Sequence, residues 1–269
     1  TGAYGLPYIY GQERQAVHMA LEVDGRKNPR QGDEEADCRQ KLIPYAMLNL
    51  YEKLQASPLF NGLTSDNLTQ IIGQTRFSFS KYEPQQIIKK EGDACRELTL
   101  LINGTLTRKT AADDRSYSVE ETEEAPYVMQ PERFFGLTQS YSSDFTAMTV
   151  CDTLSISKDD VMRLSDEFII FRLNLVGIVS TVAQKAQRNA WRTFKDDTHG
   201  RIIGFLRSHV MKPSGPKTVR IKMTRLASET GESRLKISEE LNRLQDNGLL
   251  SFSRGIITIP SFEKLMRES

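Results

Sequence analysis

The chain has 269 residues, of which 36 are Lys or Arg and 35 are Asp or Glu, so its length favours two domains while its near-neutral charge predicts no partner. Three widely spaced cysteines without a CxxC pair exclude a disulfide scaffold, a zinc knuckle and a four-cysteine iron–sulfur cluster, and they indicate a reducing compartment. Because no apolar run approaches about 18 residues and no signal peptide is visible, we expect a cytoplasmic protein without a membrane partner.

The charge is divided unevenly along the chain. Residues 191–269 contain 15 basic and 9 acidic residues, a net charge of +6, whereas residues 1–190 carry a net charge of −5. This division is typical of a sensor joined to a nucleic-acid binder. The alternative is a chance imbalance on solvated faces.

The chain is predicted to begin with an extension and two short helices. Residues 1–44 are rich in Gly and charge and weakly periodic, so we interpret them as an N-terminal extension. Apolar residues from Tyr45 onward then repeat at helical spacing until Ser57-Pro58, where a helix must end. A second helix follows, with Leu63, Leu68, Ile71 and Ile72 as its apolar face.

Between residues 76 and 157 the apolar period changes to two, which predicts β-strands. RFSFSKY alternates, and LTLLINGTLTRKT carries the Asn103-Gly104 signal of a tight hairpin. Further short runs, YSVEETE, YVMQ, FTAMTV and DTLSIS, are spaced as in an antiparallel sandwich or barrel. We therefore predict an α+β fold with an antiparallel β jelly roll in a domain spanning residues 45–165.

Residues 166–194 are predicted to form a long helix between this domain and the next. Its apolar residues follow steps of four, three and four, which is a coiled-coil-like seam. The seam consists of Phe171, Leu175, Ile178 and Val182. It could pack on its own sandwich, but we expect it to pair with the same helix of a second chain, because isologous pairing in a homodimer covers such a stripe on both copies.

The stretch MTRLASETGESRLKISEELNRLQDNGLLSFSRGIITI, residues 223–259, is the most specific in the sequence. A short helix reaches Gly231, Ser233 can cap a second helix, and two strands joined by Ser253-Arg254-Gly255 follow. Helix, glycine turn, capped helix and β-hairpin in this order indicate a winged helix-turn-helix within residues 195–269. The alternative is a three-helix bundle with solvated charges.

The second of these helices predicts which residues meet DNA. If Ile237, Leu241 and Leu244 face inward, the residues that project outward and read bases are Arg234, Leu235, Ser238 and Glu239. Arg suits guanine, and Glu can accept from a cytosine amino group. The residues expected to contact phosphates are Lys222, Thr224, Ser233, Lys236 and Arg254.

In its order of motifs, the chain resembles the Crp/Fnr family of bacterial transcription regulators over roughly residues 57–262. The motifs are SPLFNGLTSDNL, the KKEGD turn, LINGTLTRK, the ERFFG turn, HGRIIGFL and LASETGESRLKISEELNRLQDNGLL. The resemblance implies a cyclic-nucleotide-type β-roll, a dimerisation helix and a C-terminal winged helix-turn-helix. It also implies a homodimer on a pseudo-palindromic site that contacts RNA polymerase.

The resemblance fails where family members bind a cyclic nucleotide. Their pattern is Phe-Gly-Glu followed by Arg-Ser/Thr-Ala, with Glu on the ribose and Arg on the phosphate. Here Leu137 takes the Glu position and Phe145 the Arg position, while Ala186-Gln187 replaces the purine-contacting Thr-Ser. Without a cation the phosphate would be desolvated and unpaired, so we expect no control by cAMP.

The candidate effector pocket remains open to two interpretations. It holds an apolar or neutral ligand, or it is filled and the hydroxyls of FFGLTQSYSSDFTAM only satisfy a turn. The residues of this candidate pocket are Gly136, Leu137, Tyr141, Phe145 and Thr146.

No catalytic or metal-binding pattern stands out in the sequence. Since no His lies between His18 and His199, a multi-His cupin site in the sandwich is excluded, and no nucleophile motif or P-loop is present. We expect no enzyme activity, metal or cofactor, and the effector is unidentified. The sequence therefore predicts a DNA-binding regulator; the alternative is a small-molecule sensor whose C-terminal module docks a protein partner.

Overall fold

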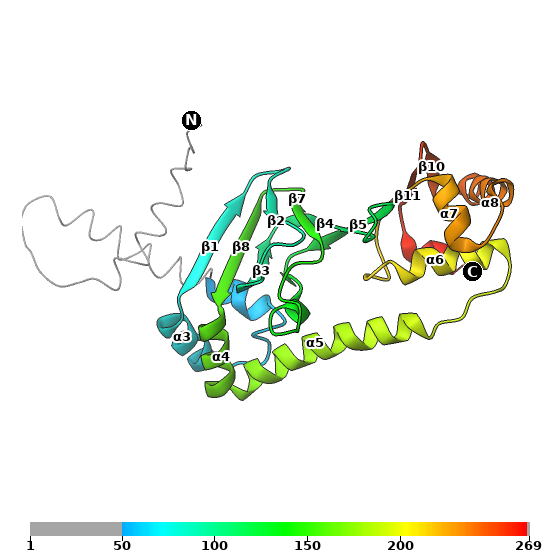
Figure 1. Cartoon of the computed structure of the whole chain (residues 1–269). Helices are drawn as coiled ribbons and strands as arrows, with labels where there is room; N and C mark the ends of the chain where they lie inside the picture. The colour runs from blue at the N-terminus through cyan, green and yellow to red at the C-terminus, as the bar shows by residue number, and fades with distance from the viewer. Residues whose placement is uncertain (1–49, 268–269) are drawn as a thin grey trace, which may run out of the picture.

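The computed structural model describes residues 50–267, so the predicted extension over residues 1–44, with His18 and Cys38, lies outside the described residues. Figure 1 shows a β-sandwich, a long helix that runs beneath it, and a smaller helical unit beside the sandwich near the far end of that helix. The predicted α+β class is confirmed. Residues 50–56 are helical, and α3 (Ser65–Gln74) follows, with the Thr64 hydroxyl accepting from the Asn67 N–H.

The sandwich consists of two antiparallel sheets; β7 alternates between buried and half-buried residues, whereas β3 and β8 each have four consecutive buried residues. The first sheet has the order β1 (Phe77–Tyr82), β8 (Cys151–Ser157), β3 (Glu97–Asn103), β6 (Tyr127–Val128). The second contains β5 (Tyr117–Glu124), β4 (Thr105–Ala111), β7 (Asp144–Ala147) and β2 (Ile87–Lys89) in that order. A single 3-10 turn, η1 (Pro131–Arg133), precedes the loop that leads into β7.

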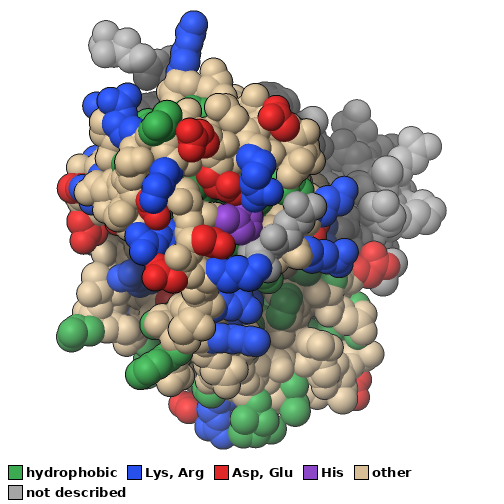
Figure 2. Space-filling view, turned by 90° about the vertical axis from the view of Figure 1, so that its right-hand side faces the viewer, with side chains coloured by type: hydrophobic (Ala, Val, Ile, Leu, Met, Phe, Trp, Pro, Cys, Tyr) green, Lys and Arg blue, Asp and Glu red, His purple; other side chains and the backbone are tan. Residues whose placement is uncertain are grey.

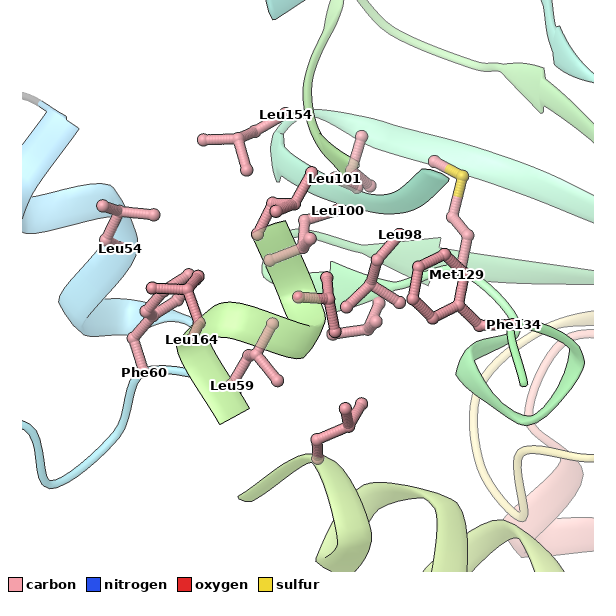
Figure 3. Close-up of a cluster of buried hydrophobic side chains, with 14 of the residues drawn as sticks. Leu54, Leu59, Phe60, Leu98, Leu100, Leu101, Met129, Phe134, Leu154 and Leu164 are labelled. Atoms are coloured by element: carbon pink, nitrogen blue, oxygen red, sulfur yellow. The ribbon is translucent and has the colours of Figure 1, made fainter. Parts of the chain in front are cut away.

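The core of the sandwich joins the strands to the helices at its base. Figure 3 shows Leu98, Leu100 and Leu101 of β3 facing Leu164 and the N-terminal helical segment. All of these side chains are buried. The helices therefore close one end of the sandwich and fix the start of the long helix against it.

The predicted hairpin at Asn103-Gly104 is wrong. β3 and β4 flank Gly104 but lie in different sheets, so the turn is a corner between the two layers. Gly104 has φ 92°, and a Cβ there would lie 2.3 Å from the Val150 carbonyl oxygen. Glycine is needed because the chain turns past another backbone at this corner, which the hairpin signal does not distinguish.

The long helix is divided in two by Phe168. α4 (Lys158–Glu167) ends there and α5 (Ile169–Ala190) begins. Phe171 and Leu175 are buried in the sandwich core, and Ile178 packs against it. The predicted dimer seam is therefore wrong for Phe171 and Leu175, because their own chain covers them, whereas Ile178 and Val182 are half-buried.

A different face of α5 is apolar and exposed in the single chain. It carries Ile169, Leu173 and Val176, again in steps of four and three. α5 is also long and apolar enough, by length and composition, to span a membrane. However, a helix that inserts Phe171 and Leu175 into a sandwich core already has one face packed on protein.

The C-terminal unit has the predicted three helices and two wing strands in order, and it adds a strand after the first helix and a short C-terminal helix that were not predicted. α6 (Thr198–Ser208) begins at Asp197, whose carboxylate accepts from the Gly200 N–H at 2.6 Å. It is followed by β9 (Lys217–Ile221), α7 (Met223–Thr230), α8 (Arg234–Asp246), β10 (Ser251–Ser253), β11 (Ile256–Ile259) and α9 (Phe262–Leu265). The apolar side chains of these elements form a second core, separate from that of the sandwich. The winged helix-turn-helix is confirmed as a fold.

Strand β9 joins this unit to the sandwich. It pairs with β11 on one edge and with β5 on the other, so one sheet of seven strands runs through both units, in the order β10-β11-β9-β5-β4-β7-β2. Val119 of β5 lies in the C-terminal core. This pairing was not predicted from the sequence.

Candidate nucleic-acid interface

The turn between α7 and α8 has the geometry that its sequence predicts. Gly231 adopts the left-handed conformation with φ 67°, and its N–H donates to the Ala227 carbonyl. The Ser233 hydroxyl then accepts from the Lys236 N–H at 3.3 Å, which caps α8. Since a left-handed residue ends one helix and a capped residue starts the next, the angle between α7 and α8 is set locally.

The inner face of α8 is held by a core and by one ion-pair network. Ile237, Leu241 and Leu244 are fully buried, as predicted. On the side facing α6, the Glu240 carboxylate accepts from Arg243 at 2.6 and 2.9 Å and lies 2.7 Å from His199 Nδ1. Hydrogen bonds from Arg243 and His199 lower the pKa of Glu240 against its partial burial. These contacts fix α8 with its opposite face outward.

The outward face of α8 presents the four residues predicted to read bases. Arg234, Leu235 and Glu239 are exposed and Ser238 is half-buried, all in the first two turns of the helix. Within residues 50–267 the structure has no ion pair to Arg234 or Glu239, so both charges are open to a partner. Leu235 is 70% exposed, so an apolar side chain stands between the two charged ones on this face.

The residues predicted to contact phosphates surround this helix. Lys222 immediately precedes α7, Thr224 lies in its first turn, and both are exposed. Arg254 occupies the wing turn with φ 48°, next to Gly255. Lys236 forms an ion pair with Glu232 at 3.2 Å and is otherwise exposed. Figure 2 shows that this end of the molecule carries basic side chains interleaved with acidic ones around a histidine.

The residues predicted to line an effector pocket do not share one space. Leu137 is 106% exposed in the loop after η1, whereas Phe145 on β7 is fully buried. Tyr141 is also buried, with its ring centroid 6.0 Å from that of Phe145. The prediction is therefore wrong for Leu137, and the two aromatic rings belong to the packed core. Gly136 and Thr146 are half-buried.

Two serine hydroxyls of this loop are hydrogen-bonded within the chain. The Ser142 hydroxyl accepts from the Gln130 side-chain amide at 2.7 Å, and the Ser142 backbone N–H donates to the Gln130 side-chain carbonyl at 2.9 Å. Ser143 and Thr110 are hydrogen-bonded at 2.8 Å. These contacts favour the interpretation in which the hydroxyls satisfy a turn.

A buried cation does lie beside Phe145, and the sequence interpretation missed it. Arg108 on β4 is directly opposite Phe145 in the sheet and donates to Tyr127 Oη at 3.4 Å and to Glu121. Glu123 lies 3.5 Å away. Burial opposes the charge, but these three neighbours raise the pKa of Arg108. The sequence did contain a signal for the burial of Arg108. In an alternating strand, a residue two positions after the buried Leu106 lies on the same face.

No protein-family model and no curated protein matches the chain. Among solved structures, it is similar to the catabolite activator protein of Thermus thermophilus, with 18% identity over 79% of this chain and 97% of that chain, at a TM-score of 0.42. The c-di-GMP responsive global regulator CLP of Xanthomonas campestris gives 17% identity over 73% and 99%, at 0.41. The sensor domain of the transcriptional regulator DNR of Pseudomonas aeruginosa gives 16% over 54% and 95%, at 0.44. The chain is thus similar to several regulators at low sequence identity.

Proposed function

We propose that the chain is a sequence-specific DNA-binding transcription regulator of the Crp/Fnr type that acts as a homodimer. The observation that carries this proposal is the capped helix α8, which is backed by Ile237, Leu241 and Leu244 and presents Arg234, Ser238 and Glu239 outward. A helix-turn-helix places such a helix in the major groove, where Arg and Glu side chains distinguish base pairs. Lys222, Thr224, Ser233, Lys236 and Arg254 are the proposed phosphate contacts.

The proposed dimer uses the exposed face of α5. Ile169, Leu173 and Val176 form an apolar stripe that nothing within residues 50–267 covers. A second copy placed about a two-fold axis would bury the same stripe on both chains. The two α8 helices would then meet half-sites about one helical turn apart, ~34 Å. RNA polymerase is the further partner that the resemblance implies, and we expect neither a membrane partner nor catalysis.

Replacing Arg234 with alanine is expected to weaken binding to the best duplex selected from a random library by about 1–3 kcal/mol. The preference should be lost at one base pair in each half-site, because the guanidinium reads one guanine. Lys236→Ala should instead weaken binding to all DNA sequences by a similar factor. Titrations of selected and scrambled duplexes separate the two effects.

The matched control for this experiment is Lys264→Ala, which removes an exposed positive charge from α9. It should change the affinity for the selected duplex far less than Arg234→Ala does. If Arg234→Ala leaves affinity and base preference unchanged, α8 does not read DNA as proposed.

We also expect the protein to bind DNA without cAMP or cGMP. The position that would hold the phosphate is the fully buried Phe145, and the nearby cation Arg108 is already paired with Glu121 and Glu123. A cyclic phosphate would therefore remain uncompensated. Calorimetric titration should give no heat, and DNA affinity should not change with either nucleotide. Micromolar binding coupled to tighter DNA binding would contradict this expectation.

One observation favours the alternative of a sensor that docks a protein partner. Leu235 projects from the outward face of α8 with 70% of its surface exposed, as an apolar anchor in a protein interface would. Retention on duplex DNA or heparin separates the two functions, because phosphate contacts make binding fall steeply with salt. A salt-independent interaction through Leu235 would support the alternative.

A further inference from the structure

The acidic strand β5 and the turn before it lie against basic residues of the C-terminal unit. The pairs are Asp114–Arg225 at 3.3 Å, Glu120–Arg220 at 2.9 Å, Glu121–Lys217 at 3.7 Å and Glu123–Lys212 at 3.9 Å. The opposite charges of the two halves of the sequence thus meet within one chain. These four contacts follow the line along which β5 and β9 form one sheet.

The buried part of this contact attaches the two units firmly. The Glu121 carboxylate accepts from the backbone N–H groups of Met211 and Lys212 at 3.2 and 2.9 Å. Tyr117 packs its ring on His209, with centroids 5.0 Å apart, and their polar atoms are 2.9 Å apart. The β5–β9 pairing is thus supported by side chains on both sides.

The exposed part of the contact occupies cations close to the proposed DNA surface. Arg225 follows Thr224 in the first turn of α7, and it is held by Asp114, by Glu229 at 2.6 Å and over the Tyr117 ring at 5.9 Å. Thr224 is a proposed phosphate contact. The acidic turn that carries Asp114 therefore lies beside a helix that would approach the DNA backbone.

We propose that the β5–β9 contact is an autoinhibitory latch, in which the acidic edge of the sandwich holds the winged helix-turn-helix in a state that binds DNA weakly. This inference rests on the proposed DNA-binding function. DNA phosphates and the carboxylate of Asp114 compete for the same end of α7, and like charges placed together oppose association. Tight binding to DNA then requires β9 to separate from β5.

The latch combines one strand pair with these side-chain contacts, and opening it withdraws Val119 and Tyr117 from the C-terminal core. The sandwich keeps its own pairing when β9 leaves, since β5 stays paired with β4, and β4 with β7. A protein that reaches its binding-competent state only part of the time shows an apparent affinity lowered by that fraction. Closing the latch permanently should therefore reduce DNA binding.

The test uses a disulfide that closes the latch. Glu120 and Thr218 are directly opposite each other on β5 and β9, so the double variant Glu120→Cys/Thr218→Cys should cross-link on oxidation. The full chain is titrated, oxidised and reduced, against a duplex that the reduced wild-type protein selects from a random library. We expect the oxidised variant to bind at least ~10-fold more weakly than its reduced form.

The control is Thr218→Cys/Thr258→Cys, which cross-links β9 to β11 inside the C-terminal unit. It shares one substituted position, and oxidation should leave its DNA affinity unchanged. Equal or tighter binding by the oxidised Glu120→Cys/Thr218→Cys protein would overturn the latch, and failure to cross-link would contradict the docked arrangement itself. If the reduced wild-type protein selects no duplex at all, it is the proposed function that fails.

A second pair of substitutions opens the latch without touching a buried group. Asp114→Asn with Glu120→Gln removes the carboxylates that hold Arg225 and Arg220, while similar side-chain shapes remain. We expect DNA binding to become several-fold tighter than that of the wild type, because two carboxylates that repel phosphates are removed and Arg220 loses its ion pair, while Arg225 keeps Glu229. Weaker or unchanged binding would count against the inhibitory role of these carboxylates.

Discussion

Replacing Leu173 and Val176 together with glutamate is expected to give a monomeric protein that no longer binds a two-half-site operator. Both side chains are more than half exposed in the single chain, so neither the sandwich core nor α5 itself should be lost. In the proposed dimer, the substitutions would place four carboxylates in one apolar seam, where burying an unpaired charge is strongly unfavourable. Light scattering and operator titration measure the two consequences.

Two further variants show whether the effect belongs to this face. Met162→Glu places the same charge at an exposed apolar position on α4 and should leave the oligomeric state unchanged. Leu175→Glu should unfold the sandwich rather than dissociate a dimer, because Leu175 lies in its core. A wild-type protein that is monomeric at micromolar concentration would contradict the proposed dimer.

Replacing Glu121 with alanine is expected to lower the free energy of unfolding by about 3–5 kcal/mol, since removing one partner leaves buried charges uncompensated. Glu121 pairs with Arg108 and Lys217, and all three side chains are almost completely buried. Burial lowers the pKa of Lys217, and the charge of Glu121 opposes this shift. Urea denaturation followed by circular dichroism gives the change in midpoint.

The neighbouring residue provides the matched control. Glu120→Gln removes a carboxylate one position away, but its partner Arg220 is about half exposed, so the change should not exceed about 1 kcal/mol. Combining Glu121→Gln with Lys217→Met should cost less than the sum of the two single changes, because the second substitution removes a charge that the first leaves unpaired. Additive costs would show that the buried charges do not act as a cluster.

Local signals predicted the helix-turn-helix well. Gly231, the Ser233 cap and the spacing of Ile237, Leu241 and Leu244 are determined within a few residues, and the structure has each of them as expected. Short runs of apolar and β-branched residues separated by turn residues also located the strands of the sandwich, although β3 and β8 do not alternate in burial. In contrast, the Asn103-Gly104 turn has hairpin chemistry but connects two sheets, because pairing partners depend on strands that lie far away in the sequence.

The periodicity of α5 showed that an apolar stripe existed but not what covers it. Phe171 and Leu175 pack on the sandwich, while Leu173 and Val176 remain exposed. A helix with apolar residues on two faces needs two partners. Spacing alone cannot assign the faces, since both have steps of four and three.

The contact between β5 and β9 could not be derived from either segment alone. KTVRI alternates apolar and polar residues as an ordinary wing-domain strand would, and its second edge is covered by a strand about 100 residues earlier. The uneven charge of the two halves was visible in the sequence. Some of these opposite charges attract each other within the chain, in addition to any attraction of the basic half for DNA.

The most direct test of the central claim is footprinting of the wild-type dimer on the duplex that it selects from a random library. The account predicts two protected half-sites related by a two-fold axis, with centres one helical turn or ~34 Å apart. When the protein concentration is limiting, the Arg234→Ala variant should protect neither half-site. If the protein selects no duplex, or protects DNA without a repeated half-site and regardless of Arg234, the proposal of a dimeric, α8-reading regulator is contradicted.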